Sequence, residues 1–283
     1  MVKVISDSTC DLSQDLLEKY NVAILPLHIL LGEEEYLDRV NITPDEIFVW
    51  ADAHKTTPKT SAPSLDAAVE LLKPYVEAGD EVVCFSISDE MSASGNVMRL
   101  AAGELEAEDR VRVINSQNLS TGIGLLVLEA ASMAMEGKSA AQIEERILEL
   151  RPLVRASFVV DTLVYLHRGG RCSGLAAMAG GALKLHPRIA VEAGKMHPGK
   201  KYRGSINKVV MAYVTDMEEE LKQAKKERVF ITHSGCDPEL VDEVRSYLCS
   251  LGHFGEILET RAGGVISSHC GPGTLGVLFI AKS

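Results

Sequence analysis

The residues best equipped for chemistry stand together near the C-terminus, in segment 267–273, whose sequence is Ser-Ser-His-Cys-Gly-Pro-Gly. Hydroxyl, imidazole and thiol groups serve nucleophilic and acid–base catalysis, and the same groups can bind the polar head of a ligand. On an extended strand His269 and Cys270 would point to opposite faces, so they are poorly placed to act as base and nucleophile. The segment therefore indicates either catalysis with a distant serine, such as Ser61 or Ser92, or a binding site without catalysis.

Signatures of other catalytic and nucleotide sites are incomplete or absent from the sequence. Residues 122–124, Gly-Ile-Gly, lack the third glycine of a dinucleotide fingerprint, because position 127 is valine. Neither a Walker A loop nor the Gly-x-Ser-x-Gly turn of hydrolases occurs. His233 and Cys236 have no second pair at zinc spacing, so we expect no metal site. A nucleotide-binding α/β protein is disfavoured, whereas a serine or cysteine acyl hydrolase or transferase using His269 stays open.

Composition bounds the class of protein. The 283 residues are 46% hydrophobic and 24% charged, which is typical of a globular chain and favours two domains. No window approaches the roughly 18 apolar residues of a membrane span, and the apolar N-terminal stretch is too short for a signal peptide. The cysteines are scattered, which favours reduced thiols and a cytoplasmic location. A net charge of −11 without a basic run argues against nucleic-acid binding.

Strand-like and helix-like segments alternate through the first half, which favours a mostly parallel α/β sheet. Expected strands cover 2–6, 22–31, 82–88 and 111–115, and expected helices begin at Thr43, Ser64, about Ser92 and Gly122. In the second half we expect strands at 158–160, 229–233 and 275–281, a hairpin through Gly194, and helices over 173–183, 207–226 and 238–251. We place the boundary after Arg151-Pro152, giving an N-terminal α/β domain, 1–152, and a C-terminal α/β domain with a mixed sheet, 153–283.

Four motifs follow one another along nearly the whole chain. They are Ser-Asp-Ser-Thr-Cys-Asp-Leu at 6–12, Thr-Ser-Ala-Pro-Ser at 60–64, Asp-Thr-Leu-Val-Tyr-Leu-His-Arg-Gly-Gly-Arg at 161–171, and His-Cys-Gly-Pro-Gly at 269–273. In this order they resemble the DegV family of bacterial fatty acid-binding proteins. Two positions depart from the family pattern: Ala62 replaces a glutamine, and Ala93-Ser94 replaces the Gly-Thr pair after the serine.

The resemblance implies a two-domain DegV fold with the acyl chain between the domains, and no cofactor other than that fatty acid. It implies a carrier without its own catalytic centre, which presents the carboxylate to a partner fatty acid kinase of the DhaK/DhaL-like type. The acyl phosphate would enter phospholipid synthesis, through transient contact with a membrane or an acyltransferase. Thr60, Ser61, Ser92 and His269 would form the carboxylate site, and Arg171 is the next candidate.

A fatty acid needs a dry slot for its tail and donors for its carboxylate. Burying about 14 methylenes contributes up to ~11 kcal/mol at ~0.8 each, before ordering costs, so tight binding needs no covalent step. Arg171 follows two glycines and could pair with a carboxylate through two hydrogen bonds, although an ordinary salt bridge is an equal alternative. Arg203 is a weaker candidate, facing solvent or the kinase. The small residues of 175–183 predict either room for a tail or tight helix packing.

Overall fold

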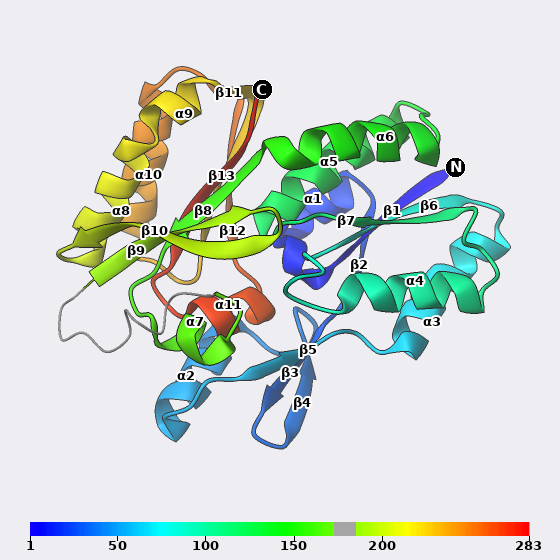
Figure 1. Ribbon diagram of the computed structural model, residues 1–283, viewed down its shortest axis with the longest axis horizontal. Coiled ribbons are helices and arrows are strands. Elements are labelled where there is room, and N and C mark those ends of the chain that lie inside the picture. Colours follow the sequence, from blue (N-terminus) through cyan, green and yellow to red (C-terminus); the bar gives the residue numbers. More distant parts are fainter. Residues whose placement is uncertain (173–184, 283) are drawn as a thin grey trace.

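Residues 1–172 and 185–282 are described by the computed structural model, and a four-stranded parallel sheet organises the first half of the chain (Figure 1). Its order is β2 (Val22–Leu25), β1 (Val2–Asp7), β6 (Glu81–Ser86) and β7 (Val111–Asn115). Helices α3 (Leu65–Glu77) and α4 (Ser94–Glu104) cover one face, and α5 (Thr121–Met135) and α6 (Ala140–Leu150) cover the other. Covered on both faces, its central strands are continuous apolar runs: Val83 packs toward α5 and Val82 toward α3 and α4.

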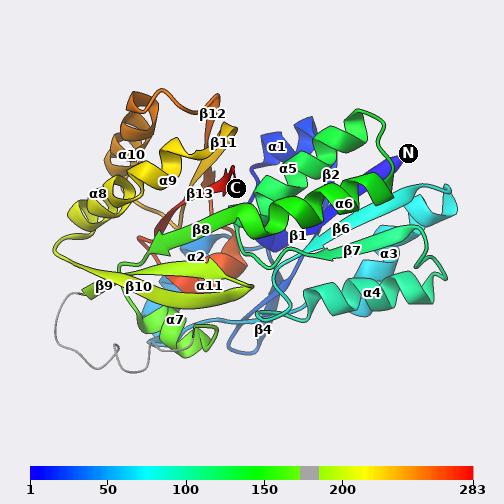
Figure 2. The ribbon, with the colours of Figure 1, turned by 45° about the horizontal axis from the view of Figure 1, so that its top comes forward.

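The second half forms a six-stranded mixed sheet. Its order is β10 (Lys195–Arg203), β9 (Leu185–Glu192), β8 (Val154–Val159), β13 (Leu275–Ala281), β11 (Ala224–His233) and β12 (Glu256–Arg261). Helices α8 (Ile206–Asp216), α9 (Glu218–Lys222) and α10 (Pro238–Ser250) lie along one side (Figure 1). The other side meets α5, which also contacts β1 (Figure 2). Because α5 lies between two sheets, it is apolar on nearly all sides.

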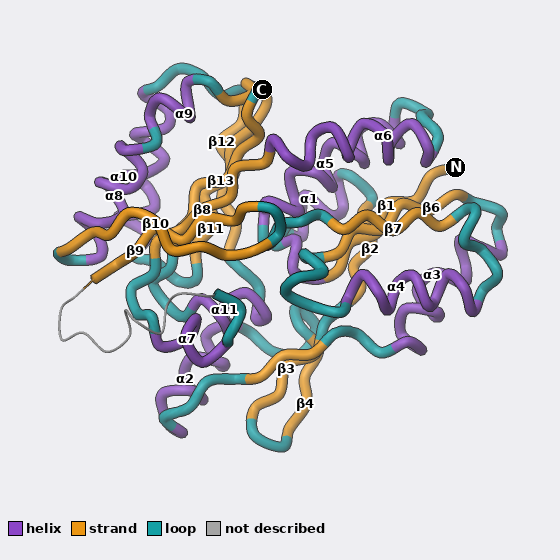
Figure 3. The backbone as a smooth tube through the Cα atoms, viewed as in Figure 1, coloured by secondary structure: helices purple, strands orange, loops and turns teal. Residues whose placement is uncertain are grey.

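A small antiparallel sheet joins the two halves. Its order is β4 (Glu34–Leu37), β3 (His28–Leu31) and β5 (Lys59–Ser61). Helices α2 (Pro44–His54), α7 (Val164–Gly169) and α11 (Gly264–Cys270) gather beside it (Figure 3). Helix α11 comes from the far end of the sequence, yet it contacts α2, α7, β3 and β5. The small sheet thus holds the C-terminal histidine segment against the N-terminal half.

Short elements complete the described chain. They are the turn η1 (Ser8–Cys10), helix α1 (Gln14–Lys19) and the turn η2 (Arg151–Leu153). No helix in the described ranges is long and apolar enough to cross a membrane.

The predicted architecture, a parallel sheet followed by a mixed one, is confirmed, but several elements differ from expectation. The strand predicted for 22–31 is two strands in different sheets, because Pro26 lacks the N–H needed to continue a ladder. The helix predicted for 207–226 ends earlier, and β11 begins at Ala224. His269 and Cys270, considered above on an extended strand, lie on helix α11 instead. The helix predicted over 173–183 lies outside the described residues. The domain boundary after Pro152 stays a prediction.

Candidate functional site

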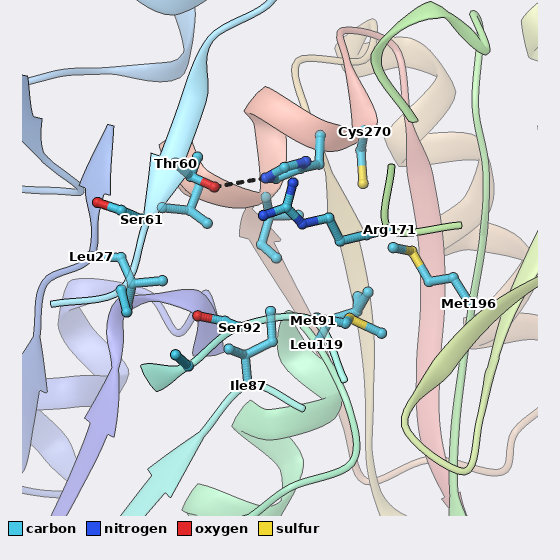
Figure 4. A pocket seen from close by; sticks show the side chains of 15 residues that line it. Leu27, Thr60, Ser61, Ile87, Met91, Ser92, Leu119, Arg171, Met196 and Cys270 are labelled. Carbon is cyan, nitrogen blue, oxygen red and sulfur yellow. Dashed lines mark hydrogen bonds between the residues drawn. The ribbon is translucent and has the colours of Figure 1, made fainter. Parts of the chain in front are cut away.

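A cavity of about 140 Å³ lies where the two halves meet, beyond the carboxyl ends of β6 and β7 (Figure 4). In open α/β sheets this is the edge at which ligands bind, because the connecting loops diverge there and leave a crevice. Leu27, Ile87, Met91 and Leu119 line it from the first half, and Met196, Val265 and Ile266 from the second. All five residues predicted for the head-group site also line it: Thr60, Ser61, Ser92, Arg171 and His269.

Thr60 and His269 meet directly in this cavity. The Oγ1 atom of Thr60 lies 2.8 Å from Nε2 of His269, although the residues are 209 positions apart. Thr60 stands opposite Ile29 in the β3–β5 ladder, so the two side chains share a face, and Ile29 packs against α11 at Gly264. The register of the small sheet therefore aims Thr60 at the helix that carries His269.

His269 is a neutral imidazole with one free nitrogen. Burial lowers the pKa of His269 to about 4, and the positive charge of Arg171 adds to the effect. Its Nδ1 atom is buried and has no hydrogen-bond partner among the described residues. Gly169 makes room for this ring, because a Cβ there would come within 2.5 Å of Nδ1. The ring thus contacts Thr60 through Nε2, whereas Nδ1 lies against Gly169 and is not exposed to the cavity.

Arg171 extends its guanidinium into the cavity (Figure 4). Its Nη1 donates to the carbonyl oxygen of Gly169 at 2.6 Å. Within the described ranges no carboxylate lies within ion-pair distance of it, so the salt-bridge alternative gains no support there. A cation near a buried imidazole is suited to a ligand anion, which could accept two hydrogen bonds from it.

The two predicted serines are placed differently from each other. Successive side chains of a strand alternate, so Ser61 on β5 directs its hydroxyl away from Thr60 and the cavity (Figure 4). Ser92 lies across the cavity from Thr60 (Figure 4), and its Oγ accepts from the backbone N–H of Ser94 at 3.2 Å. Helix α4 begins two residues later than expected, with Ala93 as its N-cap. Ser92 can still donate its hydroxyl proton to a ligand.

The same geometry gives little support to covalent catalysis. Burial raises the pKa of the Cys270 thiol to about 12, so the thiolate is scarce at neutral pH. Ser267 and Ser268 donate to the carbonyl oxygens of Ala262 and Gly264. His269 lacks, within the described chain, the carboxylate that orients a catalytic imidazole in a triad. The arrangement is that of a binding site with one cation and several neutral donors.

Comparison with known proteins agrees with this geometry. The family model described as uncharacterised proteins of the DegV family matches residues 1–282. The chain belongs to the DegV family. It is 32% identical over 281 residues to a DegV domain-containing protein of Clostridium perfringens, and the match covers 99% of both chains.

Solved structures show the same two-domain DegV fold. A DegV protein of Thermus thermophilus described by its fatty acid binding has a TM-score of 0.87 and 31% identity, covering 99% of both chains. A stearic acid-binding protein of Eubacterium ventriosum has a TM-score of 0.86 and 31% identity, covering 100% of this chain and 99% of the other. The resemblance drawn from the four motifs is therefore confirmed at the level of family and fold.

In this DegV chain two buried aspartates hold the start of α11, a role that the sequence did not reveal. Asp11 accepts from the backbone N–H of Gly263 at 2.8 Å, and Asp38 from that of Gly264 at 2.7 Å. Carboxylates at a helix N-terminus satisfy free N–H groups and favour the dipole. A Cβ on Gly264 would approach Ile29 to 2.5 Å, so α11 can sit this close only with glycine there. For Asp11 the sequence signal was an acidic residue inside the motif at 6–12, whereas Asp38 lies outside the four motifs.

Proposed function

We propose that this DegV protein binds one long-chain fatty acid, with the carboxylate between His269, Thr60 and Arg171 and the tail along the apolar wall. The observation that carries the proposal is that one apolar cavity is lined by the guanidinium of Arg171 and by the hydrogen-bonded pair of Thr60 and His269 (Figure 4). The fatty acid binding described for the Thermus thermophilus and Eubacterium ventriosum proteins supports the same ligand.

The candidate hydrogen-bond donors for the carboxylate differ in strength. A buried carboxylate without partners is strongly destabilised, and two charge-assisted hydrogen bonds from Arg171 compensate for its lost hydration. When the Nε2 hydrogen of His269 is donated to Oγ1 of Thr60, the hydroxyl proton of Thr60 is left to donate to the carboxylate. Ser92 completes the set from the opposite wall, and Ser61 stays the weakest of the five candidates because its hydroxyl points away.

The protein acts in this proposal as a carrier rather than an enzyme. Arg171 and Ser61 are exposed and Thr60 is half-buried, so the polar end of the cavity lies near the surface. A fatty acid held this way presents its carboxylate to a partner kinase of the DhaK/DhaL-like type, which would form the acyl phosphate for phospholipid synthesis. Dependence on intracellular ATP agrees with a cytoplasmic location.

Calorimetry with a matched pair of ligands tests the proposal. Delipidated protein is titrated with palmitate and with methyl palmitate, which has the same tail but no charged head. Palmitate is expected to bind at one equivalent and the ester at least about ten-fold more weakly, because it cannot pair with Arg171. Equal affinities for the acid and the ester would show that the cavity does not recognise the charged head group. Hydrolysis of the ester would favour the acyl hydrolase instead.

The kinase step needs a separate experiment. Protein loaded with palmitate is mixed with ATP and a fatty acid kinase catalytic subunit, and acyl phosphate is trapped as the hydroxamate. We expect product only when all three are present. Product from this protein and ATP alone would contradict the carrier role, and no product with any such kinase would contradict the partnership.

A further inference from the structure

A hairpin of the second half forms part of the cavity wall. It consists of β9 and β10, and its tip reaches the loop that follows β6 in the first half (Figure 3). Met196, close to the tip, lines the cavity. Cys172 pairs with Met196 in an isolated parallel bridge, so the residue next to Arg171 is attached to this hairpin.

A buried hydrogen bond fastens the tip of this hairpin to the first half. The Oγ of Ser88 donates to the carbonyl oxygen of Gly194 at 2.7 Å, and Ser88 is fully buried. Gly194 has a positive φ of 83°, and a Cβ there would come within 2.6 Å of the Ser88 Oγ, so glycine permits this close approach. Lys195 and Glu90 form an ion pair of 3.3 Å beside it, but both side chains are exposed, so the pair contributes little.

Ser88 also organises the loop that forms the other wall of the cavity. Its carbonyl oxygen accepts from the backbone N–H groups of Met91 at 2.9 Å and Ser92 at 3.1 Å, and its Oγ accepts from that of Glu90 at 3.3 Å. Met91 and Ser92 both line the cavity. One buried residue behind the wall therefore connects the loop that carries Ser92 with the hairpin to which Arg171 is attached.

We propose that Ser88 is a positioning residue for the head-group site, which holds Arg171 in place by way of the hairpin. This inference rests on the proposed fatty acid binding. Without the Ser88 bond the hairpin can move away from the first half, and Arg171 then occupies its binding position only part of the time. The apparent affinity for a carboxylate falls by that fraction, because only the competent population binds. A ligand without a carboxylate gains nothing from Arg171, so its affinity should change little.

A double-mutant cycle tests the inference. Delipidated Ser88→Ala is titrated with palmitate and with methyl palmitate. Loss of one hydrogen bond predicts about five-fold weaker palmitate binding, with the affinity for the ester changed by less than about two-fold. In the Arg171→Met background the same substitution should weaken palmitate binding no further, because the residue that Ser88 positions is gone.

Ser132→Ala is the matched control for this cycle. The Ser132 hydroxyl donates to the carbonyl oxygen of Leu128 at 2.8 Å within α5, and neither residue lines the cavity. The substitution therefore removes the same kind of hydrogen bond elsewhere in the protein, and it should change the affinity for neither ligand.

The outcomes distinguish the role of Ser88 from fatty acid binding itself. Additive effects of Ser88→Ala and Arg171→Met, equal weakening of the acid and the ester, or no weakening at all would overturn the role of Ser88 while leaving fatty acid binding intact. Failure of the unmodified protein to bind palmitate would overturn the proposed function as well. Ser88→Cys, whose thiol is a weak donor, is the second variant if Ser88→Ala does not fold, and it should give a smaller loss of palmitate affinity in the same direction.

Discussion

Thr60 and His269 form a hydrogen bond of 2.8 Å that joins the small antiparallel sheet to α11 across the cavity. The bond brings a residue of the N-terminal half to one near the C-terminus, and it fixes the imidazole whose other nitrogen is buried against Gly169. The pair is therefore the structural centre of the proposed carboxylate site. The residues that form and surround it can be substituted one at a time.

Replacing Thr60 with valine keeps the shape of the side chain and removes the hydroxyl. A net hydrogen bond is worth about 1 kcal/mol, so we expect palmitate to bind about five-fold more weakly. Ser61→Ala is the matched control, since the Ser61 hydroxyl points away from the cavity, and it should bind as the unmodified protein does. A larger loss of palmitate affinity in Ser61→Ala than in Thr60→Val would show that Ser61, and not Thr60, contacts the carboxylate.

Arg171→Met removes the cation at the polar end and retains much of the apolar stem. Hydrogen bonds to charged groups contribute ~1.5–3 kcal/mol, which predicts a loss of palmitate affinity of at least about ten-fold. Arg168→Met is the control: this arginine lies one turn earlier, on α7, and donates to the carbonyl oxygen of Lys55. If both variants bind palmitate equally well, Arg171 does not hold the carboxylate.

Gly169 sets the position of the His269 ring, and an added methyl group should displace it. In Gly169→Ala the new Cβ would come within 2.5 Å of Nδ1, so we expect weaker palmitate binding with only a small change in melting temperature. Gly103→Ala in α4 is the control, because its nearest neighbour would be the Glu108 carboxylate at 3.5 Å, far from the site. Unchanged affinity in Gly169→Ala would show that the ring position is unimportant.

Two buried groups, His269 and Asp11, are expected to change the stability of the fold with pH in opposite directions. The pKa of His269 is lowered from 6.5 to about 4, so its contribution to stability is present above pH 6.5 and is lost as the pH falls toward 4. The pKa of Asp11 is raised from 3.8 to about 7, mainly by burial, so its contribution is present below pH 3.8 and is lost as the pH rises through 7. Melting temperatures of the ligand-free protein between pH 4 and 8 should show both effects.

Two variants show which residue causes each change of melting temperature with pH. Relative to the unmodified protein, His269→Gln should gain melting temperature as the pH falls from 6.5 to 4, because glutamine does not take up a proton. Asp11→Asn, which keeps an acceptor for the Gly263 N–H, should gain as the pH rises from about 4 to 7. Parallel curves for all three proteins would show that neither group controls the pH dependence.

Sequence patterns revealed the alternating first half and the family, because apolar periodicity and short motifs are local. They also placed Thr60, Arg171 and His269 in one site, although only through family resemblance. The helical state of 264–270 was missed, since Gly263 and Gly264 begin α11 only with help from the distant Asp11 and Asp38. The split at Pro26 and the early start of β11 likewise depend on partner strands that a single segment does not reveal.

Fatty acid binding is best tested by native mass spectrometry of the purified protein. We expect a mass excess equal to one long-chain fatty acid, which organic extraction removes and one added equivalent of palmitate restores, and a weaker restoration in Arg171→Met. A protein that carries no lipid as purified and takes up none when palmitate or stearate is added would contradict it.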